Sequence, residues 1–364
     1  MNKKYIIISL SIVLLTGLLT ILINKNSKEY IMQDGIMLAL TLDGEKITSY
    51  PEGTNYGVEI ACENGTGKWL VDEWKLAIEE VIGNVVCNIE FTSNPTSLKS
   101  KVEEVNTAWG GSYRYKDTNP NNYIWFNNEM WRIIGSVSTC LESYCSTKEH
   151  LVKIIRRDSI GALTYDAKSS DYKGAWGENT LYTLLNNYYY GAQDASETAY
   201  CYGYSTTTIA KCDYRKIGIT SNSYYGKMIK NVYWNTGASS SGVAPNASEG
   251  FENNLAQTIS GYVGLMTMSD YGYATTSNYY ENYMTDFYLT DITKKNWLYG
   301  QGHELTSTKQ QGDTGSIVII NHRGNTQSTT AIFGAHVRPV VYLDSSVYIV
   351  SGDGTEANPY QIGM

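Results

Sequence analysis

Residues 121–135 read NNYIWFNNEMWRIIG, and this stretch carries the clearest fold signal in the chain. Two apolar, aromatic runs at 123–126 and 131–135 flank the polar segment 127–130. Aromatic and β-branched residues on either side of a short asparagine-rich turn are typical of a β-hairpin. We therefore expect a hairpin here, with Trp131 in the core.

Further strands and one helix are expected on either side of this hairpin. Leucine and tyrosine side chains recur at helical spacing over 178–190, and Gly191 ends that pattern. Pro339 limits the start of the last apolar run to a sheet edge or a bulge. The expected strands occupy residues 151–156, 263–267, 316–320 and 337–343. Over residues 109–364 the pattern predicts an α+β fold with more strand than helix.

The residue pattern before the hairpin predicts a small all-β module at residues 38–93. Alternating residues at 38–42 and 46–48 flank an Asp-Gly turn, which is a strong hairpin signal. Trp69 and Trp74 supply bulk for a small core. Further strands are expected at 56–62 and 84–91, and a short connecting helix at 96–107 within the linker 94–108.

The N-terminus predicts a membrane anchor. Lys3 and Lys4 precede an uncharged apolar run at residues 5–23, which as a helix would reach roughly 28 Å, about the thickness of the hydrocarbon core. A cleaved signal peptide would have a shorter apolar region and a small-residue cleavage site. We therefore expect a single-pass anchor at 5–23. Residues 1–4 would be cytoplasmic, residues 24–37 a linker, and the body extracytoplasmic at the cell membrane.

The six cysteines form three pairs of sequence neighbours, and an even number in an exported body favours disulfides. Zinc is the alternative, but none of the four histidines lies at a zinc-ligand spacing from these cysteines. We expect disulfides and no metal site. The pairing inferred from proximity joins Cys62 to Cys87, Cys140 to Cys145, and Cys201 to Cys212.

Composition narrows the classes of partner. The net charge is −8 and no basic cluster occurs, so nucleic acid is not expected as a partner. Tyrosine is abundant, with 32 residues, and suits strands and half-buried surfaces. No cofactor is indicated.

No catalytic residues can be assigned from motifs. A serine hydrolase elbow is missing from the sequence, and two carboxylates that could act together in a glycosidase cannot be recognised from spacing. Arg132 and Arg338 lie within apolar runs, where an arginine usually pairs with a buried carboxylate. The carboxylates that could serve such a glycosidase pair are Glu129, Asp166, Asp270 and Asp286.

Aromatic residues in loop-like surroundings are the candidates for ligand binding. Exposed rings stack on sugars or on protein partners, and tyrosine-rich loops form low-entropy binding surfaces. The alternative for each residue is packing within its loop. The five candidates are Trp176, Tyr188, Trp234, Trp297 and Tyr299.

Six motifs occur in an order that resembles an uncharacterised bacterial domain family of surface and exported proteins. They are the stretch 121–135 and residues 152–156, 176–186, 264–273, 296–298 and 337–343, so the resemblance covers about 109–364. This pattern is similar, more distantly, to the formylglycine-generating-enzyme-like branch of the C-type-lectin-like fold. The resemblance implies a loop-rich α+β domain whose relatives include both enzymes and variable ligand-binding displays.

These observations lead to one functional hypothesis and two alternatives. We expect a membrane-anchored bacterial surface protein that displays a lectin-like domain binding a glycan or a protein. The first alternative is an extracytoplasmic enzyme acting on carbohydrate or cell-wall material. The second is a structural component of the envelope.

Overall fold

The chain is built mostly of β-strands. In the computed structural model, 43% of the described residues are in strands and 12% in helices, so the α+β fold class expected from the sequence is wrong. The segments with apolar residues at helical spacing form only short helices. Most of the buried apolar side chains belong to strands. The structure describes residues 6–7, 30–33, 35–109, 111–167, 176–177, 179–203, 210–235, 238–239, 259–275, 284, 295–300, 302–310 and 315–364.

The helical elements are short connectors. The helix expected over 178–190 begins as a single α-helical turn capped by Asn179, whose side chain accepts a hydrogen bond from the Tyr182 N–H at 2.7 Å, and it continues as a π-helix. The connecting helix expected at 96–107 is present. The helices among the described residues are α1 (Leu98–Val105), η1 (Ser143–Cys145), α2 (Thr180–Thr183), η2 (Leu184–Tyr189), α3 (Tyr224–Lys227) and α5 (Met268–Gly272).

The chain divides into two compact units. The first contains Met1–Leu98, Ser346–Asp353 and Tyr360–Met364, and the second contains Lys99–Ser345 and Gly354–Pro359. The module predicted at residues 38–93 falls within the first unit. The C-terminal strands belong to this unit as well, although they are distant in sequence.

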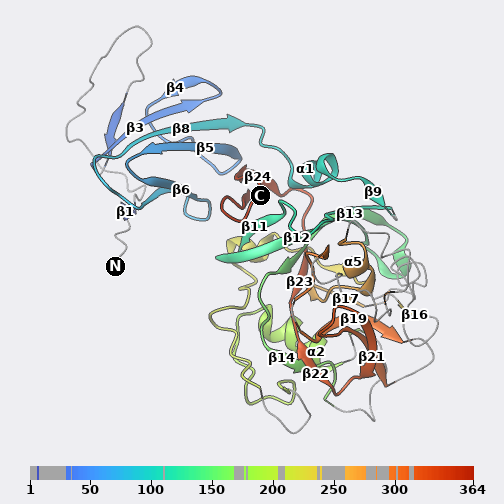
Figure 1. Cartoon of the computed structure of the whole chain (residues 1–364). Coiled ribbons are helices and arrows are strands. Elements are labelled where there is room, and N and C mark those ends of the chain that lie inside the picture. Colours follow the sequence, from blue (N-terminus) through green and yellow to red (C-terminus); the bar gives the residue numbers. More distant parts are fainter. Residues whose placement is uncertain are drawn as a thin grey trace. The chain divides into compact units, whose positions relative to one another are not determined.

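The described residues of the first unit form two sheets (Figure 1). The larger has the order β2-β3-β8-β5, with β4 paired to β3, and β3 runs parallel to β8 while the other pairs are antiparallel. The smaller has the order β1-β7-β6. The strands are β1 (Ile6–Ile7), β2 (Ile31–Gln33), β3 (Ile36–Leu42), β4 (Glu45–Ile47), β5 (Tyr56–Glu63), β6 (Thr66–Leu70), β7 (Lys75–Glu79) and β8 (Val86–Ser93).

An aromatic cluster forms the centre of this unit. The Trp69 ring lies 5.0 Å from Tyr50, 5.2 Å from Trp74 and 5.3 Å from Phe91, measured between ring centroids. Trp69 is 1% exposed. The edge-to-face angles are the arrangement that aromatic rings prefer. Trp69 and Trp74 therefore supply core bulk, as the sequence predicted.

The C-terminal residues of the first unit form a hairpin of β24 (Tyr348–Ser351) and β25 (Tyr360–Gly363). Its first strand also forms a bridge from Tyr348 to Ser97, and the Tyr348 hydroxyl donates a hydrogen bond to the Thr54 carbonyl. This hairpin was not predicted from the sequence.

The second unit is organised around a sheet that contains the expected hairpin. β11 pairs with β12 from Tyr123↔Arg132 to Phe126↔Glu129, and the two-residue turn between them places Asn127 and Asn128 at φ values of 54° and 60°. Asparagine tolerates this left-handed conformation well. The described strands of this sheet in the second unit are β9 (Ala108–Trp109), β10 (Ser112–Arg114), β11 (Tyr123–Phe126), β12 (Glu129–Cys140), β13 (Lys148–Arg156), β15 (Val232–Tyr233), β17 (Ser260–Gly261), β18 (Val263–Gly264) and β23 (Val340–Leu343).

A second sheet of this unit has the order β14-β22-β19-β20-β21, with β16 parallel to β19 (Figure 1). The sequence predicted only β20, because β19 and β21 are rich in Thr, Ser and Gln rather than in large apolar residues. Their alternating threonines are nevertheless suited to strands. The strands are β14 (Ala162–Thr164), β16 (Ala238–Ser239), β19 (Glu304–Gln310), β20 (Ser316–Ile320), β21 (Thr326–Thr330) and β22 (Gly334–His336).

The three predicted disulfides are present, joining Cys62 to Cys87, Cys140 to Cys145, and Cys201 to Cys212. Cys62 and Cys87 lie directly opposite each other on β5 and β8. Among the residues that the structure describes, no helix is long and apolar enough to span a membrane. The anchor expected at residues 5–23 lies outside those residues, apart from Ile6 and Ile7.

Candidate functional site

Three of the five aromatic residues expected to bind a ligand lie in the core. Trp176, Trp234 and Trp297 are 2%, 3% and 6% exposed. The indole N–H groups of Trp234 and Trp297 donate to the carbonyls of Gly261 and Tyr115. This burial weighs against stacking on an external ligand, and it matches the packing alternative.

The two remaining candidates, Tyr188 and Tyr299, are partly exposed. The Tyr188 ring lies 6.0 Å from the Tyr200 ring, and the Tyr299 hydroxyl donates to the His322 carbonyl at 2.6 Å. Tyr188 lies on η2, and Tyr299 lies in the segment before β19. Tyr188 and Tyr299 therefore stay candidates for ligand binding.

The two arginines expected to pair with buried carboxylates have different environments. Arg338 forms a bidentate ion pair with Glu304 at 2.5 and 2.9 Å, and both side chains are buried. Arg132 instead lies between the rings of Tyr123 and Trp297, with its Cζ atom 4.0 and 4.7 Å from their centroids. Burial lowers the pKa of Arg132 to about 10. The prediction is confirmed for Arg338 only.

The candidate carboxylates lie in different environments. Glu129 is held by a bidentate contact with Arg156 at 2.7 and 2.5 Å. Asp166 is 7% exposed, and Asp286 lies outside the described residues. Asp270 is buried between two cations, so its position suits an ion pair rather than general acid catalysis.

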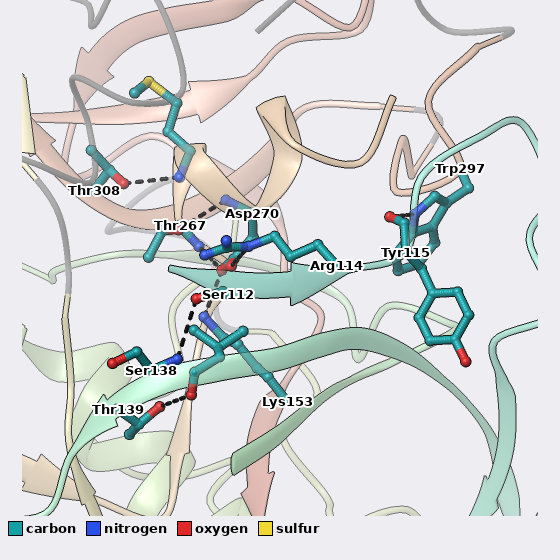
Figure 2. Close-up of polar contacts among 12 residues, drawn as sticks. Ser112, Arg114, Tyr115, Ser138, Thr139, Lys153, Thr267, Asp270, Trp297 and Thr308 are labelled. Carbon is teal, nitrogen blue, oxygen red and sulfur yellow. Dashed lines mark hydrogen bonds and ion pairs between the residues drawn. The ribbon is translucent and has the colours of Figure 1, made fainter. Parts of the chain in front are cut away.

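Arg114, Lys153 and Asp270 form a buried charge cluster, shown in Figure 2. The Lys153 Nζ lies 2.5 Å from Asp270 Oδ2, and the Arg114 Nε lies 3.8 Å from Asp270 Oδ1. All three side chains are 2% exposed. Since no ligand could reach this cluster without opening of the core, we do not assign it a binding role.

Three of the four histidines lie near one another at one end of the second sheet. The His303 and His322 ring centroids are 5.1 Å apart, and burial, with His322 and His336 adding to the effect, lowers the pKa of His303. In the part of the chain with described positions, no group of three or more His, Cys, Asp or Glu side chains could hold a metal ion.

The solvent-facing side of the larger sheet of the first unit contains a hollow of about 430 Å³, which we call the sheet-face hollow. Leu38, Leu40 and Phe91 point from this sheet into the core, and the alternate positions point outward. Small side chains at Ala39 and Ala61 leave the space. The hollow is lined by residues of β3, β8 and β5 and by the β3–β4 hairpin.

Four polar residues of the hollow form one row across the sheet. Strand register places Glu59 opposite Glu90, Glu90 beside Thr41, and Thr41 opposite Lys46. In the next row, Asn88 lies between Ala39 and Ala61. The row places two carboxylates at adjacent positions on one face.

The pairing of Glu59 with Glu90 is electrostatically unfavourable. Side chains directly opposite in an antiparallel pair have Cβ atoms about 5 Å apart, and like charges at that spacing destabilise the sheet. A cationic group placed in the hollow would relieve this repulsion. The Asn88 Oδ1 atom, which is buried and has no hydrogen-bond partner among the described residues, adds an acceptor at the same site.

The hairpin that borders the hollow is fastened to the end of β8. Asp43, at its turn, accepts hydrogen bonds from the Ser93 hydroxyl at 2.6 Å and from the Ser93 backbone N–H at 2.8 Å. These bonds lower the pKa of Asp43 below its ordinary value. The sequence predicted this hairpin but not the hollow. The hollow depends on the order of the strands in the sheet, and the alternation of apolar and polar residues does not reveal that order.

No protein-family model, curated protein or solved structure matches this chain. The resemblance to a bacterial surface-domain family and to the formylglycine-generating-enzyme-like branch therefore stays an expectation from the sequence. The arguments that follow depend on the residues themselves.

Proposed function

We propose that this chain is an exported binding protein of the bacterial surface. Its three disulfides support an extracytoplasmic position, because disulfides persist in oxidising compartments. The ligand site that the geometry supports best is the sheet-face hollow.

The ligand is a protein that inserts a lysine or arginine side chain between Glu59 and Glu90. The observation that carries this proposal is the register of β5 and β8, which sets the two carboxylates opposite each other beside the hollow. A cation placed between the two carboxylates forms charge-assisted hydrogen bonds with them, the stronger class of polar contact.

A protein ligand is favoured over a glycan by the lining of the hollow. Sugar sites commonly use aromatic side chains as stacking surfaces, and the described residues lining this hollow are aliphatic, small or polar. An extended basic segment can lie along a shallow sheet face while its cationic side chain reaches the carboxylates.

Binding of oligolysine and of uncharged oligoserine to the full-length chain, measured by isothermal titration calorimetry, tests this function. We expect oligolysine to bind and oligoserine not to bind. The double substitution Glu59→Gln and Glu90→Gln should weaken oligolysine binding about tenfold, which corresponds to roughly 1.4 kcal/mol.

Glu63→Gln is the matched control. Glu63 lies on the same strand and faces the same side of the sheet, but it does not line the hollow. If Glu63→Gln weakened binding as much as either substitution in the hollow, the contact would be a general effect of net charge and the assignment to the hollow would fail.

A further inference from the structure

The buried charge cluster contains a lysine and an aspartate at bonding distance from each other. Lys153 is on β13 and Asp270 is on α5, 117 residues later, and the side chains meet at 2.5 Å between Nζ and Oδ2 (Figure 2). Each is 2% exposed.

Keeping these two groups ionised in the core is unfavourable in itself. Desolvation of a buried ion pair offsets much of its mutual attraction. Burial, the largest influence, opposes the charge on both groups, and their attraction to each other keeps the pKa of Lys153 raised and that of Asp270 lowered. A neutral link between the same atoms would avoid burying either charge.

We propose that Lys153 Nζ and Asp270 Cγ condense to an amide, so that the mature protein carries an intramolecular isopeptide cross-link between β13 and α5. The cross-link joins segments distant in sequence within the second unit. This inference is independent of the binding function proposed for the first unit.

The condensation balances without any added reactant. The ammonium group first passes one proton to Oδ2 across their hydrogen bond, which gives a neutral amine beside a carboxylic acid. The Nζ lone pair then forms a bond to Cγ, and the electron pair of the C=O bond moves onto Oδ1. The C=O bond re-forms as the C–Oδ2 bond breaks, and a second proton passes from Nζ to Oδ2. Oδ2 leaves as water, and Nζ keeps one proton in the amide.

The neighbouring groups suit each stage of this reaction. Arg114 Nε lies 3.8 Å from Oδ1, where negative charge develops, and a fixed cation near a developing oxyanion stabilises the transition state. The Thr267 N–H donates to Oδ2 at 2.8 Å. Two charges of opposite sign disappear together, so the net charge of the cluster is unchanged.

Aromatic rings close the site to water. The Trp234 and Tyr342 ring centroids lie 5.7 and 5.3 Å from Lys153 Nζ, and both residues are buried. Because hydrolysis of the amide would need water at Cγ, exclusion of water favours the condensed product once it has formed.

Another lysine–aspartate pair in the chain provides an internal comparison. Lys230 Nζ lies 2.8 Å from Asp344 Oδ2, but these side chains are 39% and 27% exposed. Hydration stabilises both charges there and supplies water for the reverse reaction. We therefore expect a cross-link at Lys153 and none at Lys230.

Mass spectrometry of the wild-type full-length chain tests the proposal directly. The denatured protein, with its disulfides reduced, should be lighter than its sequence mass by one water molecule. Trypsin should not cut after Lys153, and the digest should contain a branched peptide joining Lys153 to Asp270. An intact mass equal to the sequence mass, with cleavage after Lys153, would overturn the proposal.

Variants locate the bond. Lys153→Arg keeps the positive charge but cannot form the amide, so its denatured mass should show no loss of water, and the same is expected for Asp270→Ala. Lys230→Arg is the control, and it should keep the loss of one water molecule. If either variant in the cluster fails to fold, the digest of the wild-type protein still decides the proposal.

Discussion

Arg338 and Glu304 form a buried bidentate ion pair, with Arg338 Nε 2.5 Å from Glu304 Oε1 and Arg338 Nη2 2.9 Å from Glu304 Oε2. Arg338 also donates to the Leu298 carbonyl at 2.5 Å. The pair joins the segment before β23 to the start of β19, and the side chains are only 7% and 3% exposed. It therefore connects the two sheets of the second unit.

Removing one partner of this pair should strongly destabilise the protein. Glu304→Ala leaves the Arg338 charge buried without its counterion, and loss of one partner of a buried pair costs about 3–5 kcal/mol. Chemical denaturation measured by tryptophan fluorescence would give this difference in the free energy of unfolding.

Glu356→Ala is the matched control for Glu304→Ala. Glu356 contacts Arg157 at 3.2 Å, and the two side chains are 59% and 43% exposed. The expected loss is below about 1 kcal/mol, because exposed ion pairs contribute little. Equal losses for the two variants would contradict the importance of burial.

Gly135 is expected to tolerate no side chain. A Cβ atom at this position would lie 2.8 Å from the Arg114 Cα and still closer to the Tyr113 carbonyl oxygen, and both contacts are with backbone. Since β10 cannot move away without breaking its pairing with β12, Gly135→Ala should destabilise the chain by at least about 1–3 kcal/mol.

Thermal unfolding followed by circular dichroism checks the effect of Gly135→Ala. Gly83→Ala is the control, because a Cβ there would meet its nearest neighbour, Asn64, at an ordinary 3.6 Å. Its effect should stay within about 1 kcal/mol in either direction. A Gly135→Ala protein as stable as the wild type would show that β10 and β12 are less closely packed than described.

The Asp43–Ser93 contact should make the hairpin beside the hollow sensitive to acid. The pKa of Asp43 is lowered, first by the Ser93 hydroxyl and then by the Ser93 backbone N–H, from an ordinary value of 3.8. A carboxylate with a lowered pKa contributes its stabilisation fully above the pKa of the unfolded state. That contribution is lost as the pH falls below 3.8 and through the lower pKa of the folded state.

A carboxyl-carbon NMR titration of Asp43 measures this shift. Ser93→Ala should raise the pKa of Asp43 toward its ordinary value, whereas Ser49→Ala, at an exposed serine of the same unit, should leave it unchanged. The account of the hairpin would be wrong if Asp43 titrated identically in the wild type and in Ser93→Ala.

Local patterns in the sequence predicted local elements well. The Asn127–Asn128 turn, the Asp43–Gly44 turn and the alternation in β5 and β8 each depend on residues adjacent in the chain, and each appears in the structure. The two helices expected at 96–107 and 178–190 both form, the first as α1 and the second as α2 followed by η2. The α+β fold class was wrong because strands far outweigh these short helices among the described residues. The missed strands β19 and β21 lacked the large apolar residues that usually mark a strand.

The candidate sites could not be predicted because they combine residues from distant segments. Trp176, Trp234 and Trp297 occupy loop-like sequence, yet tertiary packing buries them. Glu59 and Glu90 are unremarkable exposed residues until β5 and β8 pair in the observed register.

The sequence by itself determined the cysteine pairing, the turns and most long strands, because these depend on neighbours in the chain and on the alternation of apolar residues. Only the tertiary structure decided that Lys153 meets Asp270 and that Glu59 faces Glu90. Strand order and register bring such residues together, and both are set by the packing of whole sheets rather than by any short stretch of residues.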